Sequence, residues 1–210
     1  MDSRFNERRS EVGIGDALIK KMSGEYYKTQ KSVNEYIHLA KGFNGSELID
    51  KLKNVLQQHS IVLEIGSGPG TDWSILNRFY KVVGSDFSLE FLNHLRYKYP
   101  TGEFLNLDAV TLKTEQKFDG IYSNKVLHHL KDKELIESIK NQHKTLNDGG
   151  IICHSFWKGE DSEIFKGLFV NYHDKSSLRK FYEAGFDILT LDTYKEFEDG
   201  DSLLLIGKKK

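Results

Sequence analysis

Short apolar runs alternate with amphipathic stretches along most of the chain. Runs rich in branched or aromatic residues predict strands at 61–65, 81–86, 103–107, 118–123 and 150–156. Apolar residues at helical intervals predict helices between them and after them, at 46–56, 71–79, 88–99, 132–148 and 174–184. This alternation of strand and helix is typical of a parallel sheet covered on both faces.

The C-terminal part of the chain departs from that alternation. Residues 157–169 show no regular period, so we expect an irregular segment there. Residues 186–197 alternate like a strand, and residues 202–207 form another apolar run. Because the turn sequence Asp199-Gly200-Asp201 joins the two runs, we expect them to form an antiparallel hairpin.

A glycine-rich turn follows the first predicted strand and carries the clearest chemical signal. Glu64 ends the strand, and glycines stand at 66, 68 and 70, ahead of Thr71. Glycine has no Cβ, so a ligand can lie directly on such a backbone. A dinucleotide loop would need a third glycine at the position of Thr71, and a P-loop would need a lysine that is missing here.

Polar residues also follow the next three predicted strands. Asp86 ends the second strand, where a carboxylate can accept hydrogen bonds from the hydroxyls of a ribose. Asp108 and Ala109 follow the third strand, and the segment 123–130, which includes His128 and His129, follows the fourth. Ligands bind at the carboxyl ends of strands in open α/β sheets, so we expect these positions to share one cleft.

Together these motifs resemble those of class I S-adenosylmethionine-dependent methyltransferases of the type 11/25-like branch. The resemblance extends from the glycine loop through 118–130 and Asn147-Asp148-Gly149-Gly150 to Ala184-Gly185-Phe186. It implies an α/β, Rossmann-like, doubly wound and mostly parallel seven-stranded sheet with a reversed last strand. It also implies a methyltransferase domain at 46–210 and an N-terminal helical lid at 1–45.

The resemblance further implies a set of cofactor-binding residues for S-adenosyl-L-methionine. Glu64, Gly66, Ser67 and Gly68 would hold the methionine portion, with Asn124 near its amino group. Asp86 would bind the ribose, Phe87 would pack on the adenine, and Asp108 and Ala109 would contact the adenine edge. Tyr27 and Tyr36 would close over the cofactor from the lid, and Lys125 would need to point away from the sulfonium.

Histidines near the fourth strand are the candidate general bases, because histidine titrates close to neutral pH. His129 and His128 are nearest, although packing of one of them in the turn is an alternative. His154, Trp157, Tyr172 and His173 are candidates for the acceptor side. Adjacent histidines cannot project into one metal site from a regular helix, so no metal site is expected.

Composition narrows the expected partners of the chain. The 210 residues carry a formal net charge of −1, and no basic stripe favours nucleic acid. No apolar run is long enough for a bilayer, and the first ten residues lack a signal-peptide core, so we expect a cytoplasmic protein. The single cysteine, Cys153, lies in an apolar run and is expected to be buried.

These observations favour a methyltransferase that acts on a small-molecule acceptor, as a monomer or a homodimer. Two alternatives remain open from the sequence. One is a Rossmann-like, nicotinamide-dependent oxidoreductase, which Thr71 and the reversed final hairpin disfavour. The other is a non-catalytic protein that binds S-adenosylmethionine.

Overall fold

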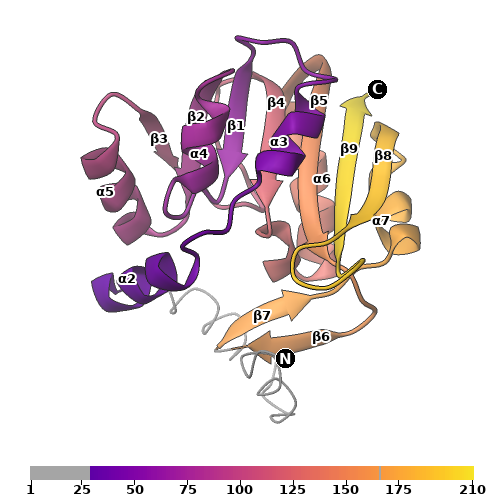
Figure 1. Ribbon diagram of the computed structural model, residues 1–210. Helices are drawn as coiled ribbons and strands as arrows, with labels where there is room; N and C mark the ends of the chain where they lie inside the picture. Colours follow the sequence, from indigo (N-terminus) through magenta and orange to yellow (C-terminus); the bar gives the residue numbers. More distant parts are fainter. Residues whose placement is uncertain (1–28, 166) are drawn as a thin grey trace.

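A seven-stranded sheet organises the computed structural model, which describes residues 29–165 and 167–210 (Figure 1). Its strand order is β3-β2-β1-β4-β5-β9-β8. The strands are β1 (Ile61–Ile65), β2 (Lys81–Asp86), β3 (Glu103–Asn106), β4 (Phe118–Asn124), β5 (Leu146–Trp157), β8 (Phe186–Tyr194) and β9 (Ser202–Lys209). Strands β1 to β5 are parallel, whereas β9 is antiparallel to both β5 and β8. The predicted parallel sheet with a reversed last strand is confirmed.

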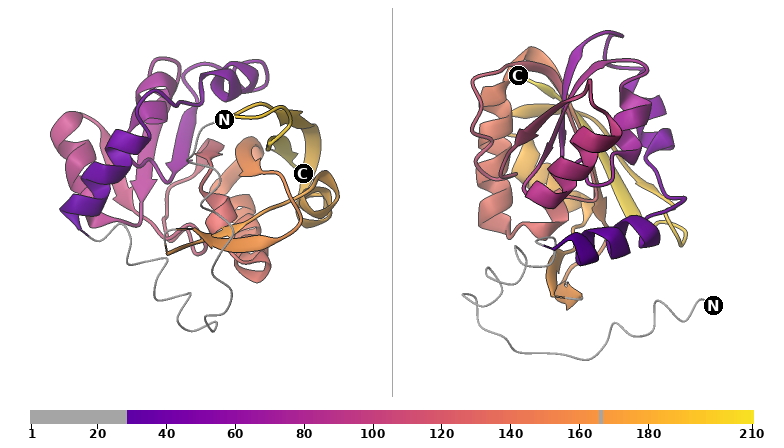
Figure 2. Two further views of the ribbon diagram at one scale, coloured as in Figure 1. Left: turned by 60° about the horizontal axis from the view of Figure 1, so that its bottom comes forward. Right: turned by 90° about the vertical axis from the view of Figure 1, so that its left-hand side faces the viewer.

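Helices cover both faces of this sheet, as the sequence predicts (Figure 2). One face is covered by α3 (Ser46–Leu52), α4 (Thr71–Leu76) and α5 (Leu89–Lys98), and the other by α6 (Asp132–Thr145) and α7 (Lys175–Tyr182). Successive strand residues point to opposite faces. Thus Ile152 packs in the core beneath α6, and its neighbour Cys153, a buried free thiol, packs in the core beneath α3.

The helix α2 (Gln30–Leu39) lies at the carboxyl-end side of the sheet, next to α5 (Figures 1 and 2). Thr29 caps it by accepting a hydrogen bond from the Ser32 N–H. Tyr36 packs edge-on against Phe91 of α5, with ring centroids 5.8 Å apart. A helix therefore stands where the lid is expected, whereas Tyr27 lies outside the described residues. None of the helices in the described ranges has both the length and the apolar character that a bilayer crossing requires.

Three helices end earlier than predicted. The helix α3 ends at Leu52 and not at 56. The helix α4 ends at Leu76, so Phe79 lies beyond it in a turn whose backbone continues into β2. The helix α6 ends at Thr145, because Leu146 is already extended and pairs with Phe118 of β4. Residues 149–150, expected to end that helix, lie within β5 at an irregularity of the ladder.

The segment 157–169 is not irregular, and that prediction is also wrong. It contains a two-stranded sheet made of β6 (Ser162–Phe165) and β7 (Leu168–Asn171). This hairpin projects at the carboxyl end of the main sheet, on the same side of the molecule as α2 (Figure 1). Its strands are only four residues long, too short for a two-residue period to stand out in the sequence.

A buried chain of hydrogen bonds links the sheet to α6. The Ser138 hydroxyl donates to the Ala109 carbonyl (2.6 Å) and accepts from the Gln142 amide (3.0 Å). The Gln142 carbonyl oxygen then accepts from His154 Nε2 (2.9 Å), which leaves His154 Nδ1 to accept from the Ser123 hydroxyl (2.8 Å). Each of these polar side chains is satisfied, so His154 is a structural residue of the core and not a residue of the acceptor side.

Replacing His154 tests this buried chain through stability and its pH dependence. Burial lowers the pKa of His154 to about 3, so the folded state keeps a neutral ring while the unfolded state takes up a proton below about pH 6.5. His154→Leu should lower the free energy of unfolding at neutral pH by about 1–3 kcal/mol, because Ser123 and Gln142 lose partners.

The same variant should lose less stability than the wild type as the pH falls from 6.5 to 5. A single histidine that stays neutral in the folded state lowers the free energy of unfolding by at most about 1.4 kcal/mol for each unit that the pH falls. Urea unfolding at several pH values measures both effects, with His38→Leu, at an exposed position of α2, as the control. Equal pH slopes in the wild type and His154→Leu would contradict this account.

Candidate active site

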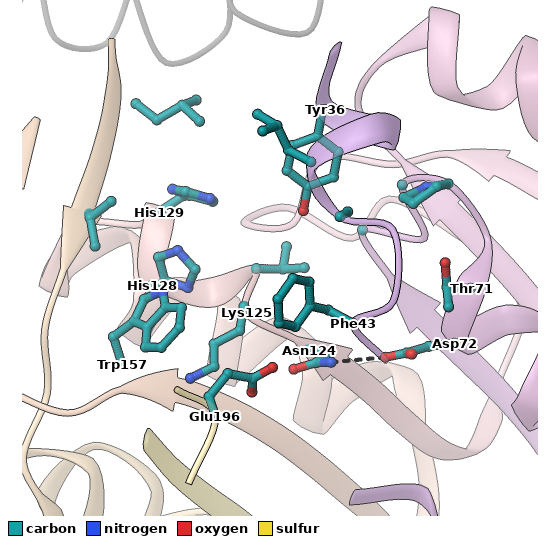
Figure 3. A pocket seen from close by; sticks show the side chains of 18 of the residues that line it. Tyr36, Phe43, Thr71, Asp72, Asn124, Lys125, His128, His129, Trp157 and Glu196 are labelled. Carbon is teal, nitrogen blue, oxygen red and sulfur yellow. Dashed lines mark hydrogen bonds between the residues drawn. The ribbon is translucent and has the colours of Figure 1, made fainter. Parts of the chain in front are cut away.

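A cavity of about 390 Å³ opens at the carboxyl ends of β1 and β4 (Figure 3). The glycine loop after β1 forms one wall, and α2 with the following loop forms another. The segment after β4 and the β6–β7 hairpin complete it. The cavity therefore lies where the sequence places ligand binding in an open α/β sheet.

The glycine loop adopts backbone conformations that favour glycine. Gly66, Gly68 and Gly70 have φ angles of +70°, +48° and +75°. A Cβ on Gly66 would lie 2.6 Å from Val126, and one on Gly70 would lie 2.6 Å from Leu95, so those two glycines are required by internal packing. A Cβ on Gly68 would meet nothing closer than Tyr36 at 4.0 Å. Gly68 is therefore the glycine of this loop that presents bare backbone to the open cavity.

Glu64 lies buried at the cavity wall, with 3 % of its surface exposed. Its Oε2 atom has no hydrogen-bond partner among the described residues. Burial, together with the nearby carboxylate of Asp72, raises the pKa of Glu64 to about 8. The side chain is thus mostly protonated at neutral pH, and it can be ionised by a cationic ligand group that enters the cavity.

Asp72, in the first turn of α4, joins three segments around the cavity. One oxygen accepts from the backbone N–H of Gly45 (2.7 Å), and the other accepts from the Tyr122 hydroxyl (2.8 Å) and the Asn124 amide (3.0 Å; dashed in Figure 3). Asp72 is not among the site residues that the sequence predicts. An acid directly after the glycine loop was the available signal, but its partners come from three distant segments.

The turn after β4 is held in an uncommon conformation. Asn124 is the last residue of β4, and its side-chain oxygen accepts from the Ser155 hydroxyl (2.5 Å). Ser155 in turn accepts from the backbone N–H of Lys125, whose φ is +54°. Few non-glycine residues occupy this region without support from neighbouring contacts. The network from Asp72 to Ser155 therefore fixes the segment that carries both candidate histidines.

Lys125 turns its amine to one end of the cavity. Its Nζ donates to the Phe156 carbonyl (3.0 Å) and to the Ser202 hydroxyl (2.6 Å), and it lies 3.5 Å from the centre of the Trp157 ring. Burial lowers the pKa of Lys125 to about 7, although the carboxylate of Glu196 counteracts that shift. The amine is thus bound to β5 and β9, which agrees with the expectation that it points away from a cofactor held by the glycine loop.

His128 and His129, on the turn η2 (Leu127–His129), both line the cavity. Nδ1 of His129 lies 2.7 Å from the Phe169 carbonyl, which can only accept, so Nδ1 carries the proton. Burial lowers the pKa of His129, and its neutral ring therefore keeps Nε2 as a proton acceptor. His128 is 3 % exposed, its Nδ1 has no partner in the described part of the chain, and burial lowers its pKa well below 6.5.

Of the residues expected on the acceptor side, Trp157 and Tyr172 line the cavity, whereas His154 and His173 are not among its lining residues. The aromatic residues Phe43 and Phe197, which sequence analysis missed, also line it. The Phe197 ring stacks on Trp157 at 5.7 Å and meets the Phe43 ring edge-on at 5.1 Å. Neither residue belongs to a motif, and only the fold brings them together.

The expected adenosine-binding residues lie beside the cavity, at the ends of β2 and β3, and not among its lining residues. Asp86 accepts from the backbone N–H groups of Gly68 and Ser88, both at 2.9 Å. Phe87 is 61 % exposed. Asp108 caps its own turn by accepting from the backbone N–H groups at 110 and 111, and the Ala109 carbonyl accepts from Ser138. Asp86 thus holds the glycine loop in place.

The site thereby gathers the expected residues into two groups. Cavity-lining residues are Glu64, Gly66, Ser67, Gly68, Asn124, Tyr36, His128 and His129. The second group lies beside the cavity, at the carboxyl ends of β2 and β3, and consists of Asp86, Phe87, Asp108 and Ala109. An α/β sheet of this order, with a glycine loop after β1 and a reversed last strand, defines the class I methyltransferase type of fold.

Comparison with a protein-family model agrees with this class. Residues 62–150 match a family described as a methyltransferase domain. The matched range contains the glycine loop, the ends of β2 and β3, and both candidate histidines. This match over residues 62–150 supports the resemblance to class I methyltransferases that the sequence shows. A search of curated proteins gives no match.

Solved structures share the fold at low sequence identity. A 1,6-didemethyltoxoflavin-N1-methyltransferase from Burkholderia thailandensis aligns over 97 % of this chain and 94 % of its own, with a TM-score of 0.72 and 15 % identity. The N-methyltransferase NodS from Bradyrhizobium japonicum aligns over 78 % and 85 %, with a TM-score of 0.62 and 16 % identity. A methyltransferase from Clostridium acetobutylicum aligns over 84 % and 98 %, with a TM-score of 0.68 and 13 % identity.

Removing the Asp72 carboxylate tests whether its hydrogen bonds hold α4 to the loop before α3 and to β4. Asp72→Ala leaves Gly45, Tyr122 and Asn124 without their acceptor, so the free energy of unfolding should fall by about 1–3 kcal/mol. Urea unfolding measures the change. Asp50→Ala is the control, because Asp50 is exposed and pairs with Lys53 at the surface. Equal losses in the two variants would contradict the role assigned to Asp72.

Proposed function

We propose that the protein transfers a methyl group from S-adenosyl-L-methionine to a small-molecule acceptor. The observation that carries the proposal is the buried Glu64 carboxyl group, whose Oε2 lacks a partner in the described structure, beside the open backbone of Gly68. Buried polar atoms normally have a hydrogen-bond partner, so an atom without one indicates that a ligand group supplies the missing hydrogen bond. The α-ammonium of a methionine moiety is such a group.

The residues present fit the cofactor along the ends of three strands. Glu64, Gly66, Ser67, Gly68 and Asn124 would surround the methionine portion at the cavity wall. Asp86 has two carboxylate oxygens, each of which accepts one backbone hydrogen bond and keeps a lone pair for a ribose hydroxyl. The exposed ring of Phe87 would be covered by the adenine, whose edge would face Asp108 and Ala109.

When bound, S-adenosyl-L-methionine supplies an electrophilic methyl group on a sulfonium. The chain then has to orient the acceptor and exclude water, and orientation alone can lower a barrier by about 7–11 kcal/mol. Tyr36 on α2 lies over Gly68, where it would shield the cofactor. We infer that residues 1–45 act as the lid of a methyltransferase domain at 46–210.

His129 is the base that we propose for an acceptor that arrives protonated. Its Nδ1–H is bound to the Phe169 carbonyl, so Nε2 is the nitrogen that can take a proton. A well-placed base contributes about 10²–10⁴-fold to the rate. His128 stays neutral next to it, at a ring-centroid distance of 4.0 Å, which avoids placing a second positive charge beside the protonated base.

A small acceptor is supported by the size of the cavity. Its volume of about 390 Å³ lies within the roughly 300–1,000 Å³ range of small-molecule sites. The structural neighbour from Burkholderia thailandensis binds 1,6-didemethyltoxoflavin together with S-adenosylhomocysteine.

Comparison of two ligands tests the proposed function. Saturating S-adenosylhomocysteine should raise the thermal midpoint, because a ligand at a hundredfold excess over Kd adds about 2.7 kcal/mol of stability. NAD should leave it unchanged. A rise with NAD alone would favour the nicotinamide-dependent alternative and would refute the proposal.

The bare backbone of Gly68 gives a matched pair of variants. Gly68 and Gly200 both have positive φ, and a Cβ at either would meet nothing closer than 4.0 Å, but of the two Gly68 lines the cavity. Gly68→Val should abolish S-adenosylhomocysteine binding in calorimetry, since the added side chain fills the place of the ligand. Gly200→Val carries the same backbone strain and should bind normally. Binding retained by Gly68→Val would mean that the loop has another role.

Ionisation of Glu64 on ligand binding gives a further prediction. The pKa of Glu64 is raised to about 8, so at pH 7 the free protein holds a proton there that an incoming ammonium should displace. Calorimetry in buffers of different ionisation enthalpy should detect this proton release when S-adenosylhomocysteine binds. Glu64→Gln should bind more weakly and release no proton from this position. Unchanged release in that variant would exclude Glu64 as the ammonium partner.

A further inference from the structure

The β6–β7 hairpin presents one face to the cavity. Glu163 pairs across the hairpin with Val170, and Phe165 pairs with Leu168. Because side chains alternate along a strand and partners share a face, these four residues lie on the same side. All four line the cavity. On this face of the hairpin the other three side chains are apolar, and Glu163 is the acidic one.

Glu163 is held in place but has no counter-ion among the described residues. One of its oxygens accepts from the Tyr172 hydroxyl at 2.5 Å, and the side chain is half-buried. Within the described ranges, no lysine, arginine or histidine nitrogen lies within 4.0 Å of this carboxylate. A partly buried carboxylate without a counter-ion attracts a cation.

The other charged groups at this end of the cavity do not offset Glu163. The Lys125 amine donates to Phe156 and Ser202, and its charge faces Glu196. Burial keeps His128 and His129 neutral by lowering the pKa of each ring. Among the described residues, Glu163 therefore has no positive charge beside it that offsets its own.

We propose that the acceptor enters as an organic ammonium ion on an apolar body, and that Glu163 binds its cationic nitrogen. This inference rests on the proposed methyltransferase function. Aromatic faces favour a cation that is partly withdrawn from water, and the ring of Tyr172, whose hydroxyl donates to Glu163, lines the same cavity. A carboxylate on the acceptor would be repelled. The hairpin lies outside the range that matches the family model, so Glu163 is a specificity-determining residue of this chain's own C-terminal part.

Three compounds with one shared body test the proposal. They are 2-phenylethylamine, 2-phenylethanol and 3-phenylpropionate, which differ in charge at the end of the same arm. Calorimetry first measures binding of S-adenosylhomocysteine and then measures binding of each compound to the loaded protein. The wild type should bind the amine most tightly and the carboxylate least tightly.

Two variants assign the preference to Glu163. Glu163→Gln keeps the side-chain shape and should weaken binding of the amine about tenfold, to the level of the alcohol. Glu160→Gln removes the same charge from an exposed neighbour outside the cavity and should change nothing. Glu163→Asp keeps the charge and should retain the order of the three ligands. Equal thermal midpoints of the loaded variants verify that the fold is intact.

The outcomes separate this inference from the proposed function. If the wild type does not bind S-adenosylhomocysteine, both the proposed function and the role of Glu163 are refuted. With that ligand bound, three results would overturn the role of Glu163 alone. They are binding of the carboxylate as tightly as the amine, an amine affinity that Glu163→Gln leaves unchanged, and no amine binding up to the solubility limit.

Discussion

The site depends on the burial of the Glu64 carboxyl group at the end of a central strand. A carboxylate withdrawn from water is strongly disfavoured unless it is paired, and the response of the protein is a pKa raised to about 8. The protonated group is tolerated in the free protein, but its Oε2 has no partner among the described residues. A cationic group that enters the cavity can supply the missing interaction, so the same burial that costs stability creates a selective binding position.

The surrounding network keeps that position accessible. Gly66 and Gly70 pack against Val126 and Leu95, which fixes the loop from both sides and leaves Gly68 facing the cavity. Asp72 ties the loop before α3 and the end of β4 to the first turn of α4. Both the cofactor wall and the histidine-bearing turn thus depend on packing and hydrogen bonds that a ligand does not need to create.

The central sheet and the glycine loop could be predicted because their signals are local. A strand such as 61–65 has a clear apolar run, and the loop after it has a fixed glycine spacing. The role of Asp72 could not be predicted, because its partners Gly45 and Tyr122 are distant in the sequence. His154 was misplaced because β5 is buried on both faces, and a continuous apolar run does not reveal which residues face which layer. The β6–β7 hairpin, with strands of four residues, gives too short a period to detect.

Carbon-13 NMR of the glutamate carboxyl groups tests the central claim most directly. We predict that in the free protein at pH 7 the Glu64 resonance, assigned by its loss in Glu64→Gln, has the chemical shift of a protonated carboxyl group. Addition of S-adenosylhomocysteine should move it to the shift of a carboxylate. A resonance that is already ionised in the free protein, or one that stays protonated when the ligand is bound, would contradict this account.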